Sequence, residues 1–527
     1  MYLITLEAWR RGLEVTYFLE KNKSNRLLIR YELSDGEKTY KFNSSLGEKV
    51  TEEAYLICNN KQKTKEVLEK NNIPVPKGKL INLDDSQEII INDIKKLKTP
   101  WVVKPLSENT GKGVYTDIKT NTDLFQALDS IRNMGHNEAI VEEQIDGTEY
   151  RVLVLGDKVL AAVKREPANI IGNGESTIEE LIQFKNKKKD ENPNLYHRYI
   201  EIDDEIKKVL KDQGYTLSSV PDSEEKIFLR NKVTLEGDPI DATETIPEIL
   251  KEISIKAVKA VPGLDMCGLD IMISTDGQSV RVIELNTRPM LGLHVFPFKG
   301  TPRDVIAPII EHYFPENKNK GFSNLYFDMN RAISPIREGV TTRVTLSRLP
   351  SVEQLIVLKI TLKNVEFEKK SILNNITLKA KELNINGSMN ERKGNKWELM
   401  LGNLYLDKIE EFIQYIQIIV GSDTVSMEIE EMDRGFPVNI GFKVNTISRS
   451  KKTIEKIKKQ NKKITKKNKK LEKNLKKSQK QQSLLISQLE LLKKEKKNLE
   501  KELSDIKSSN SWKITKPLRT ISTKMKK

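Results

Sequence analysis

The chain has 527 residues, a net charge of +15 and 37% hydrophobic residues, which is enough for about three domains of ordinary size. No apolar run reaches the roughly 20 residues that span a bilayer, and the N-terminus lacks the apolar core of a signal peptide. The only cysteines are Cys58 and Cys267, which excludes a disulfide framework and predicts a cytoplasmic location.

Charge is distributed unevenly along the chain. Residues 451–527 contain 27 Lys and Arg and 7 Asp and Glu, a net charge of +20. Residues 1–450 hold the other 63 basic and 68 acidic residues, a net charge of −5. The globular part is therefore close to neutral, and the basic character belongs to the tail.

The first predicted elements form a short α/β segment over residues 1–60. A helix then begins near Lys61, and an apolar strand carries Lys104 before a polar loop that contains Gly111 and Gly113. Two glycines allow backbone amides to approach a phosphate closely. A Gly-x-Gly pair alone is more often just a turn, so both interpretations stay open for this loop.

The next apolar strand ends in acidic residues. Glu142 and Glu143 precede a bend that contains a glycine, and Glu149 follows it. One interpretation is a hairpin edge with solvated acids. The other is a nucleotide hinge, in which the backbone at 143–145 meets the adenine edge and a carboxylate holds the ribose hydroxyls.

Further along, two predicted strands end in arginines. The strand 159–165 ends in Arg165 and a short strand ends in Arg230, while the polar residues 185–225 between them are expected to form a mobile excursion.

The pattern around residue 280 predicts an antiparallel hairpin. Apolar runs at 269–273 and 280–285 flank a cluster of turn residues. Asp270 lies on the first strand, and Glu284 and Asn286 lie two apart on the second, so they share a face. Two carboxylates and an amide oxygen make a hard site that suits Mg²⁺, which is usually shared with substrate phosphates. An exposed hairpin whose acids are only solvated is the alternative.

These motifs, in this order, resemble the ATP-grasp superfamily. Within it, the chain is similar to the ATP-grasp modules of cyanophycin synthetase and of bifunctional glutathione synthetase over roughly residues 1–315. The matching motifs lie at residues 60–65, 103–105, 111–113, 141–151, 165–174, 268–270, 283–289 and 294–303.

The resemblance implies an ATP-binding role for eight residues: Lys61, Lys104, Gly111, Gly113, Glu142, Glu143, Ile145 and Glu149. In this set the two lysines would reach the nucleotide phosphates. Glu142 would lie by the adenine amino group, beside backbone contacts from the next residues, and Glu149 would hold the ribose.

It also implies an ADP-forming carboxylate–amine ligase. A substrate carboxylate would attack the γ-phosphate of ATP, and an amine would then displace phosphate from the acylphosphate. Arg165 and Arg230 would lie near the transferred phosphoryl group and the bound carboxylate. Asp270, Glu284 and Asn286 would hold Mg²⁺, and Mn²⁺ would suit the same ligands.

One loop departs from the family. Residues 234–241 are shorter and more acidic than the Gly-Gly loop of those relatives, which handles the reacting end of the substrate. The resemblance therefore leaves the substrate open, and an inactive nucleotide-binding module is an alternative.

The C-terminal half predicts three further regions. Residues 316–350 are predicted as a linker, and residues 351–446 as a βαββαβ domain that is similar to the ferredoxin-like acylphosphatase domain. Its helices are predicted at 369–383 and 406–420, and its last strand at 438–444. The loop 363–368 lacks the arginine and glycines of that family, so the domain is expected to be non-catalytic. The whole is of the α+β class.

Residues 450–507 carry an unbroken heptad pattern, which predicts a long coiled-coil helix and a homodimer. A solvated single helix is the alternative, because its many lysines repel one another. The basic tail 508–527 contains Trp512 and resembles the tail of bacterial surface-polysaccharide glycosyltransferases. It predicts peripheral contact with an anionic membrane surface on the inner face of the plasma membrane rather than with nucleic acid.

The sequence thus predicts a ligase of cell-envelope or capsule polymer biosynthesis, acting on a small carboxylate and an amine such as an amino acid or a sugar acid. The alternatives are a small-peptide ligase, glutathione-like or poly-amino-acid, and an inactive nucleotide-binding scaffold for envelope glycosyltransferases.

Overall fold

The computed structural model describes residues 1–22, 25–106, 113–318, 320–365, 367, 370–421, 426–447, 495–496 and 499–500. Apart from the last four of these positions, the predicted coiled coil (450–507) and basic tail (508–527) lie outside the described residues, as does Gly111. The described part has the expected α+β class, with helices and several sheets. None of its helices is both long and apolar enough to cross a lipid bilayer.

The N-terminal sheet is completed by a strand from far along the chain. Its order is β17–β1–β2–β3–β4, and helix α1 (Tyr2–Arg10) packs beside it. The last strand runs antiparallel to the first, and the hydroxyl oxygens of Thr16 and Thr345 lie 2.9 Å apart across the pair. The strand bounds are β1 (Glu14–Lys21), β2 (Leu27–Ser34), β3 (Thr39–Asn43), β4 (Leu46–Gly47) and β17 (Arg343–Leu346).

The segment 316–350, predicted as a linker, belongs to this folded body. Its elements are η1 (Pro315–Asn317), β16 (Leu325–Tyr326), α11 (Met329–Arg337) and β17. Asp328 caps α11 by accepting hydrogen bonds from two backbone amides. Ile333 and Ile336, three residues apart on α11, are buried in the core shared with the N-terminal sheet. The polar composition of the segment concealed this short amphipathic helix.

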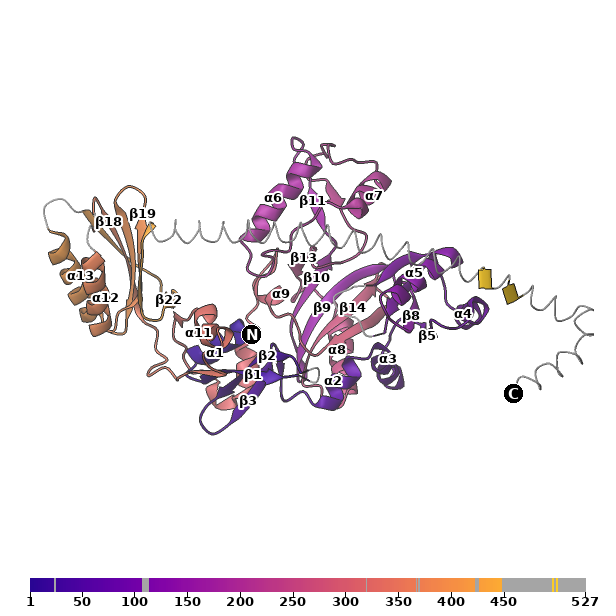
Figure 1. Cartoon of the computed structure of the whole chain (residues 1–527), viewed down its shortest axis with the longest axis horizontal. Coiled ribbons are helices and arrows are strands. Elements are labelled where there is room, and N and C mark those ends of the chain that lie inside the picture. The colour runs from indigo at the N-terminus through magenta and orange to yellow at the C-terminus, as the bar shows by residue number, and fades with distance from the viewer. Residues whose placement is uncertain are drawn as a thin grey trace, which may run out of the picture.

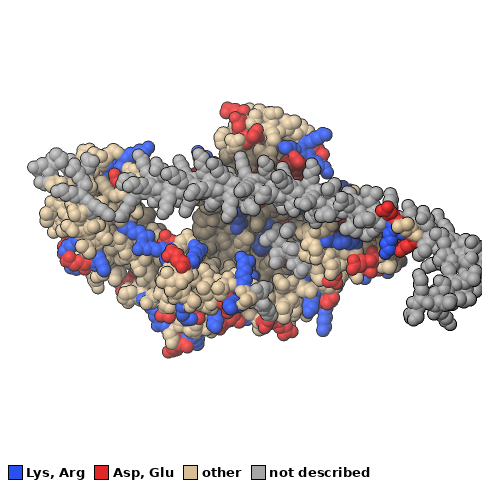
Figure 2. Space-filling view, viewed as in Figure 1, with Lys and Arg blue, Asp and Glu red and all other residues tan. Residues whose placement is uncertain are grey.

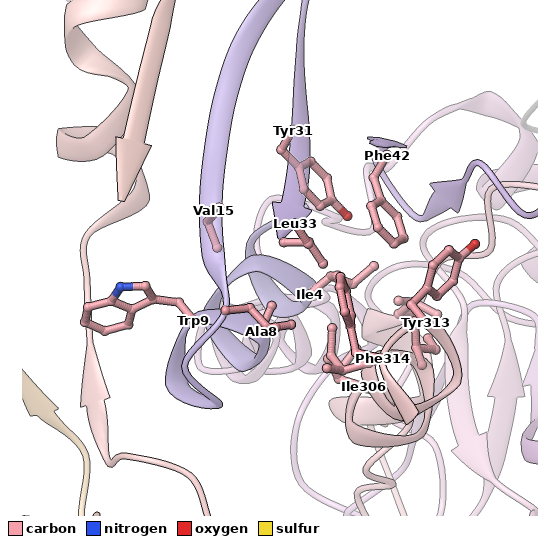
Figure 3. Close-up of a cluster of buried hydrophobic side chains, with 14 of the residues drawn as sticks. Ile4, Ala8, Trp9, Val15, Tyr31, Leu33, Phe42, Ile306, Tyr313 and Phe314 are labelled. Carbon is pink, nitrogen blue, oxygen red and sulfur yellow. The ribbon is translucent and has the colours of Figure 1, made fainter. Parts of the chain in front are cut away.

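One hydrophobic core joins the N-terminal sheet to helix α10 (Ile306–Tyr313) (Figure 3). Tyr31 and Phe42 stack within it, with ring centroids 5.2 Å apart. Leu355 and Val357 belong to the same core, so the C-terminal unit is packed onto the N-terminal body.

A four-stranded sheet in the order β5–β8–β6–β7 carries three predicted site residues, Lys104, Glu142 and Glu143. Helices α4 (Gln87–Ile94) and α5 (Asn121–Asn133) supply its apolar core. The strand bounds are β5 (Gly78–Asn82), β6 (Trp101–Pro105), β7 (Tyr115–Ile118) and β8 (Glu138–Glu143).

The central sheet has the order β13–β10–β9–β14–β15. Its strands are β9 (Gly147–Leu155), β10 (Lys158–Glu166), β13 (Asp238–Asp241), β14 (Met266–Ser274) and β15 (Val280–Asn286). One face packs on helices α2 (Glu52–Cys58), α3 (Lys61–Lys70) and α8 (Glu248–Ala260), which lie beneath the curved strands in Figure 1. The short helix α9 (Gly292–Val295) follows β15.

A lobe above the central sheet contains α6 (Ile178–Asp190), α7 (Asp204–Asp212), β11 (Asn169–Ile171) and β12 (Lys226–Phe228) (Figure 1). Residues 185–225, predicted as a mobile excursion, instead contribute Ile200, Ile206 and Leu210 to a hydrophobic core that they share with the rest of this lobe. Ile206, Val209 and Leu210 are buried on one side of α7. This apolar pattern spans only a few residues and is surrounded by charged residues, so it did not predict a helix from the sequence.

The C-terminal unit follows the order β18 (Ile356–Lys363), α12 (Lys370–Glu382), β19 (Asn386–Arg392), β20 (Lys396–Asn403), α13 (Leu406–Val420) and β21 (Ser426–Glu431). In the sheet the order is β21–β18–β20–β19–β23. The last strand of the motif was predicted at residues 438–444, but β21 holds that place. Residues 438–445 instead form β22 (Val438–Asn439), which pairs with β16, and β23 (Phe442–Asn445), which runs parallel to β19.

Candidate active site

The predicted hairpin of β14 and β15 is confirmed, and it brings three candidate residues to one face. Asp270 lies directly opposite Glu284, and Gly268 lies opposite Asn286. Alternation along a strand therefore puts both carboxylates and the amide on the same face of the sheet. A β-bulge follows Asp270, which is a common feature beside functional sites.

Arginines from the neighbouring strands hold the acidic residues of this face. Arg151 on β9 donates two hydrogen bonds to Asp270, one of them 2.7 Å long. Arg165 on β10 donates to Glu149, and its Nη1 also lies 3.7 Å from Asp270 Oδ1. Burial raises the pKa of Glu149, against the opposing effect of Arg165. These cross-strand pairs form a dense charge network in which each acid has a cation.

Three lysines gather on the other side of Glu284. Lys61 and Lys65 lie one turn apart on α3, and Lys104 comes from β6. Lys61 Nζ lies 3.5 Å from Glu284 Oε1, and Lys104 Nζ lies 2.6 Å from Glu142 Oε2. The lysines surround a cavity of about 20 Å³, which has room for about one water molecule.

Lys65 is the least satisfied member of this lysine group. Its Nζ is buried, lies 3.6 Å from Glu142 Oε1 and has no hydrogen-bond partner in the part of the chain that the structure describes. A buried ammonium that lacks a full set of acceptors is costly unless an anion joins it. The orphaned Nζ therefore fits a site for a phosphate group.

The remaining hinge residues are placed on or beside β8. Both oxygens of Glu142 face lysines, so its carboxylate is already paired in this conformation. The Glu143 amide donates to the Lys77 carbonyl at 2.8 Å. Ile145 is half-buried just beyond the strand, and Gly113 has a φ of +71°, which suits glycine.

A cavity of about 480 Å³ opens over the hairpin face of the central sheet, within the usual size range of small-molecule sites. It brings together five predicted residues: Glu149, Arg165, Asp270, Glu284 and Asn286. The loop 234–239 and the segment 195–198 of the lobe line its other side. In Figure 2 the surface is hollowed below the lobe, and acidic and basic side chains are interspersed over the visible face.

Arg230 is not brought to this cavity. The resemblance implied that it lies near a bound carboxylate, but protein carboxylates enclose it instead. Its guanidinium donates to Asp203 at 2.7 Å, to Glu205 at 3.1 Å and to Glu236 at 3.0 Å. The side chain is 5% exposed, so in this conformation Arg230 ties α7 to the loop that lines the cavity.

The predicted metal ligands offer oxygen atoms of the kind that Mg²⁺ prefers. Asn286 is half-buried, and its Nδ2 has no hydrogen-bond partner among the described residues. Among the described residues, no group of three or more His, Cys, Asp and Glu side chains is arranged to hold a metal. Two carboxylates and an amide nevertheless fit a cation that keeps several waters, as Mg²⁺ does.

Sequence reasoning missed several residues of this site. Lys65 could have been found, because it lies four residues after Lys61 on a predicted helix. Arg151 could also have been found from its alternation with Glu149. Arg198 and Arg288 also line the cavity. Arg288 lies within the motif 283–289, whereas Arg198 lies in a segment without periodicity, so the sequence carried no signal for Arg198.

Part of the chain is similar in sequence to known proteins. Residues 58–175 match the RimK-like ATP-grasp domain. The chain is 36% identical over 331 residues to the glutathione biosynthesis bifunctional protein GshAB of Clostridium perfringens. This match covers 59% of this chain and 40% of that protein. The chain is also 34% identical over 275 residues to cyanophycin synthetase of Trichormus variabilis, in a match that covers 50% of this chain and 30% of that protein. The chain thus spans less than half the length of either relative.

Among solved structures, the bifunctional glutathione synthetase of Pasteurella multocida matches with a TM-score of 0.42 and 29% identity. The match covers 55% of this chain and 40% of that one.

Proposed function

Since the chain carries a RimK-like ATP-grasp domain, we propose that it is an ATP- and Mg²⁺-dependent ligase that joins a carboxylate to an amine. The observation that carries the proposal is the opposition of Asp270 and Glu284 on one hairpin, beside Asn286 and beneath a cavity of about 480 Å³. Lysines on one side of this hairpin and arginines on the other provide the positive charge that phosphoryl transfer needs.

In the proposed reaction, a substrate carboxylate oxygen attacks the γ-phosphorus of ATP and ADP leaves. An amine then attacks the carbonyl carbon of the acylphosphate, loses a proton, and phosphate leaves as the amide forms. Such chemistry depends on positioning and charge neutralisation rather than on a nucleophilic side chain.

Each group of site residues would have its own role in this reaction. Lys61, Lys65 and Lys104 would bind the nucleotide phosphates, and Arg165 would orient the carboxylate beside the transferred group. The hinge residues Glu142, Glu143 and Ile145 would contact the adenine, and Glu149 the ribose.

Asp270, Glu284 and Asn286 would hold Mg²⁺, or Mn²⁺ in its place. The ion would neutralise charge on the transferred phosphoryl group. Because Arg151 and Lys61 now occupy the two carboxylates, we expect these cations to share or yield their partners when the ion and nucleotide bind.

For the biological role, we propose assembly or modification of a cell-envelope polymer by a cytoplasmic enzyme, peripheral on the membrane and dimeric through residues 450–507. The sequence of the tail supports this role, with its heptads and its Trp512-containing basic end. The C-terminal unit would be an acylphosphatase-like, non-catalytic module, supported by its βαββαβ order. A small-peptide ligase is the second candidate, favoured by the name of a relative that acts in glutathione biosynthesis.

The test is phosphate release from ATP and Mg²⁺ by the full chain, with a panel of amino acids, uronic acids and amines. We expect release that requires one acid and one amine, and a product whose mass is the sum of both minus water. The proposal would be contradicted by phosphate release that is independent of every acid and amine. It would also be contradicted by tight ATP binding with no ligation product on soluble or membrane-extracted acceptors.

A further inference from the structure

The carboxylates and the arginines that line the large cavity do not all form ion pairs with one another. Each of its five carboxylates already has a Lys or Arg partner among the described residues: Glu149 with Arg165, Glu166 with Lys226, Asp238 with Lys185, Asp270 with Arg151 and Glu284 with Lys61.

The arginines of the lining divide differently. Arg151 and Arg165 are paired, whereas no described carboxylate lies within ion-pair distance of Arg198 or Arg288. The lining therefore presents two uncompensated guanidinium groups to whatever occupies the cavity, and an anionic ligand would complement them.

Arg198 is the better placed of these two arginines. Its side chain is half-buried, and the only partner of its guanidinium in the described structure is Met290 Sδ, at 3.2 Å from Nη2. A thioether is a weak acceptor, while a guanidinium has five donors that suit a carboxylate. Arg288 is exposed and stacks over the Tyr55 ring at 5.4 Å, so an anion there would stay largely in water.

The segment that carries Arg198 is fixed from within the lobe. The ammonium of Lys189, a fully buried residue, donates to the backbone carbonyls of Arg198 and Glu236. It thereby joins the two stretches of chain that line the far side of the cavity. Asn192 adds hydrogen bonds of 3.2 Å to the carbonyls of Phe296 and Pro297. The backbone that carries Arg198 is thus held in place before any ligand binds, which lowers the entropic cost of binding.

We propose that Arg198 binds a substrate carboxylate that is not consumed in the reaction. The cavity would then take an α-amino acid or a peptide with a free carboxylate as the amine, or a dicarboxylic acid as the acid. This inference rests on the proposed ligase function, and it gives Arg198 the carboxylate-binding role that the enclosed Arg230 cannot fill in this conformation.

The test compares matched substrates with Arg198 variants of the full chain. Amines are offered as pairs of amino acid and carboxamide, such as glycine and glycinamide, and acids as pairs such as glutarate and butyrate. For the wild-type protein we expect the member with the extra carboxylate to be preferred. The pair that shows the preference identifies which substrate Arg198 contacts.

Arg198→Met should raise the KM of that substrate by roughly 10- to 100-fold, the usual effect of losing a charge-assisted hydrogen bond. The KM of Arg198→Lys should lie between the values for the wild type and Arg198→Met, because lysine keeps the positive charge but lacks the planar guanidinium. The KM for ATP should stay unchanged, which a general loss of folding would not allow. Arg337→Met, which removes an exposed arginine from α11, is the matched control.

The outcomes separate this inference from the ligase proposal. Turnover that shows no preference for the extra carboxylate, or an Arg198→Met enzyme with wild-type KM values for both substrates, would overturn the role of Arg198 and leave the ligase intact. A wild-type protein that neither binds Mg·ATP nor forms an amide with any pair would overturn both.

Discussion

Lys104 and Glu142 form an ion pair of 2.6 Å on adjacent strands, and each side chain is only 8% exposed. A buried pair of this kind is costly to break by removing one partner, because the other charge is left in a poorly solvated place. Both residues also belong to the proposed nucleotide site. We therefore expect stability and nucleotide binding to be coupled at these two residues.

Lys104→Met should lower the free energy of unfolding by about 3 kcal/mol and weaken ATP binding. The loss should lie at the low end of the range for buried pairs, because Lys65 remains 3.6 Å from Glu142. Urea unfolding and nucleotide titration measure the two effects. Lys79→Met, at an exposed position of β5, should change neither, and a stable Lys104→Met protein with full ATP affinity would contradict the assignment.

Glu284→Ala should reduce Mg-dependent ATP turnover roughly 100-fold or more, because it removes a proposed ligand of the ion. Its pair with Lys61 is long and partly exposed, at 3.5 Å, so the free energy of unfolding should change by less than about 1 kcal/mol. Turnover is measured against Mg²⁺ concentration, with Glu252→Ala on the exposed side of α8 as the control. Wild-type turnover in Glu284→Ala would refute the metal assignment.

The buried Lys189 should make the free energy of unfolding depend on pH in the alkaline range. Burial lowers its pKa from 10.5 to about 8, so the folded protein loses this proton at a lower pH than the unfolded chain does. Between about pH 8 and 10.5 the unfolded state binds more protons, and the contribution of Lys189 to the free energy of unfolding rises with pH over this window.

In Lys189→Met this rise should be missing, so the stability difference between wild type and variant should shift in favour of the wild type from pH 7.5 to pH 10. Urea unfolding at several pH values measures it. Lys187→Met, at an exposed position of α6, should follow the wild-type curve. Parallel curves for Lys189→Met and wild type would show that Lys189 titrates normally.

Arg230→Met should loosen the lobe rather than the central sheet. It leaves Asp203, Glu205 and Glu236 without their shared cation, and we expect a local loss of about 2 kcal/mol, since two of these acids are half exposed. Hydrogen exchange should show reduced protection of α7 amides and unchanged protection of β9 and β14. Intact protection together with lost ligation would instead place Arg230 in contact with substrate.

Local patterns predicted the parts of the fold that depend on near neighbours. Two apolar runs around a cluster of turn residues predicted the hairpin, and the two-residue spacing of Glu284 and Asn286 predicted their shared face. The helices predicted at 369–383 and 406–420 correspond closely to α12 and α13. In each case the residues that specify the element lie within it, so a single sequence is enough.

Patterns failed where the partner lies far away in the chain. Nothing in residues 343–346 indicates that they pair with β1, because a short edge strand carries little signal of its own. Arg230 has the residue type expected of a substrate contact, yet its role depends on carboxylates from α7 and from the loop at 236. Likewise, Arg198 is recognisable only once the fold has paired the other charges around it.

The pairing of β1 with β17 also has a consequence for synthesis of the chain. A ribosome has released the residues of β1 and β2 long before it makes Leu346, the partner of Val15. During this interval β1 presents a bare edge to other nascent chains, and long-range pairing of this kind is slow and prone to aggregation. We expect newly made protein to need chaperone protection of its first strand until more than three hundred further residues have been translated.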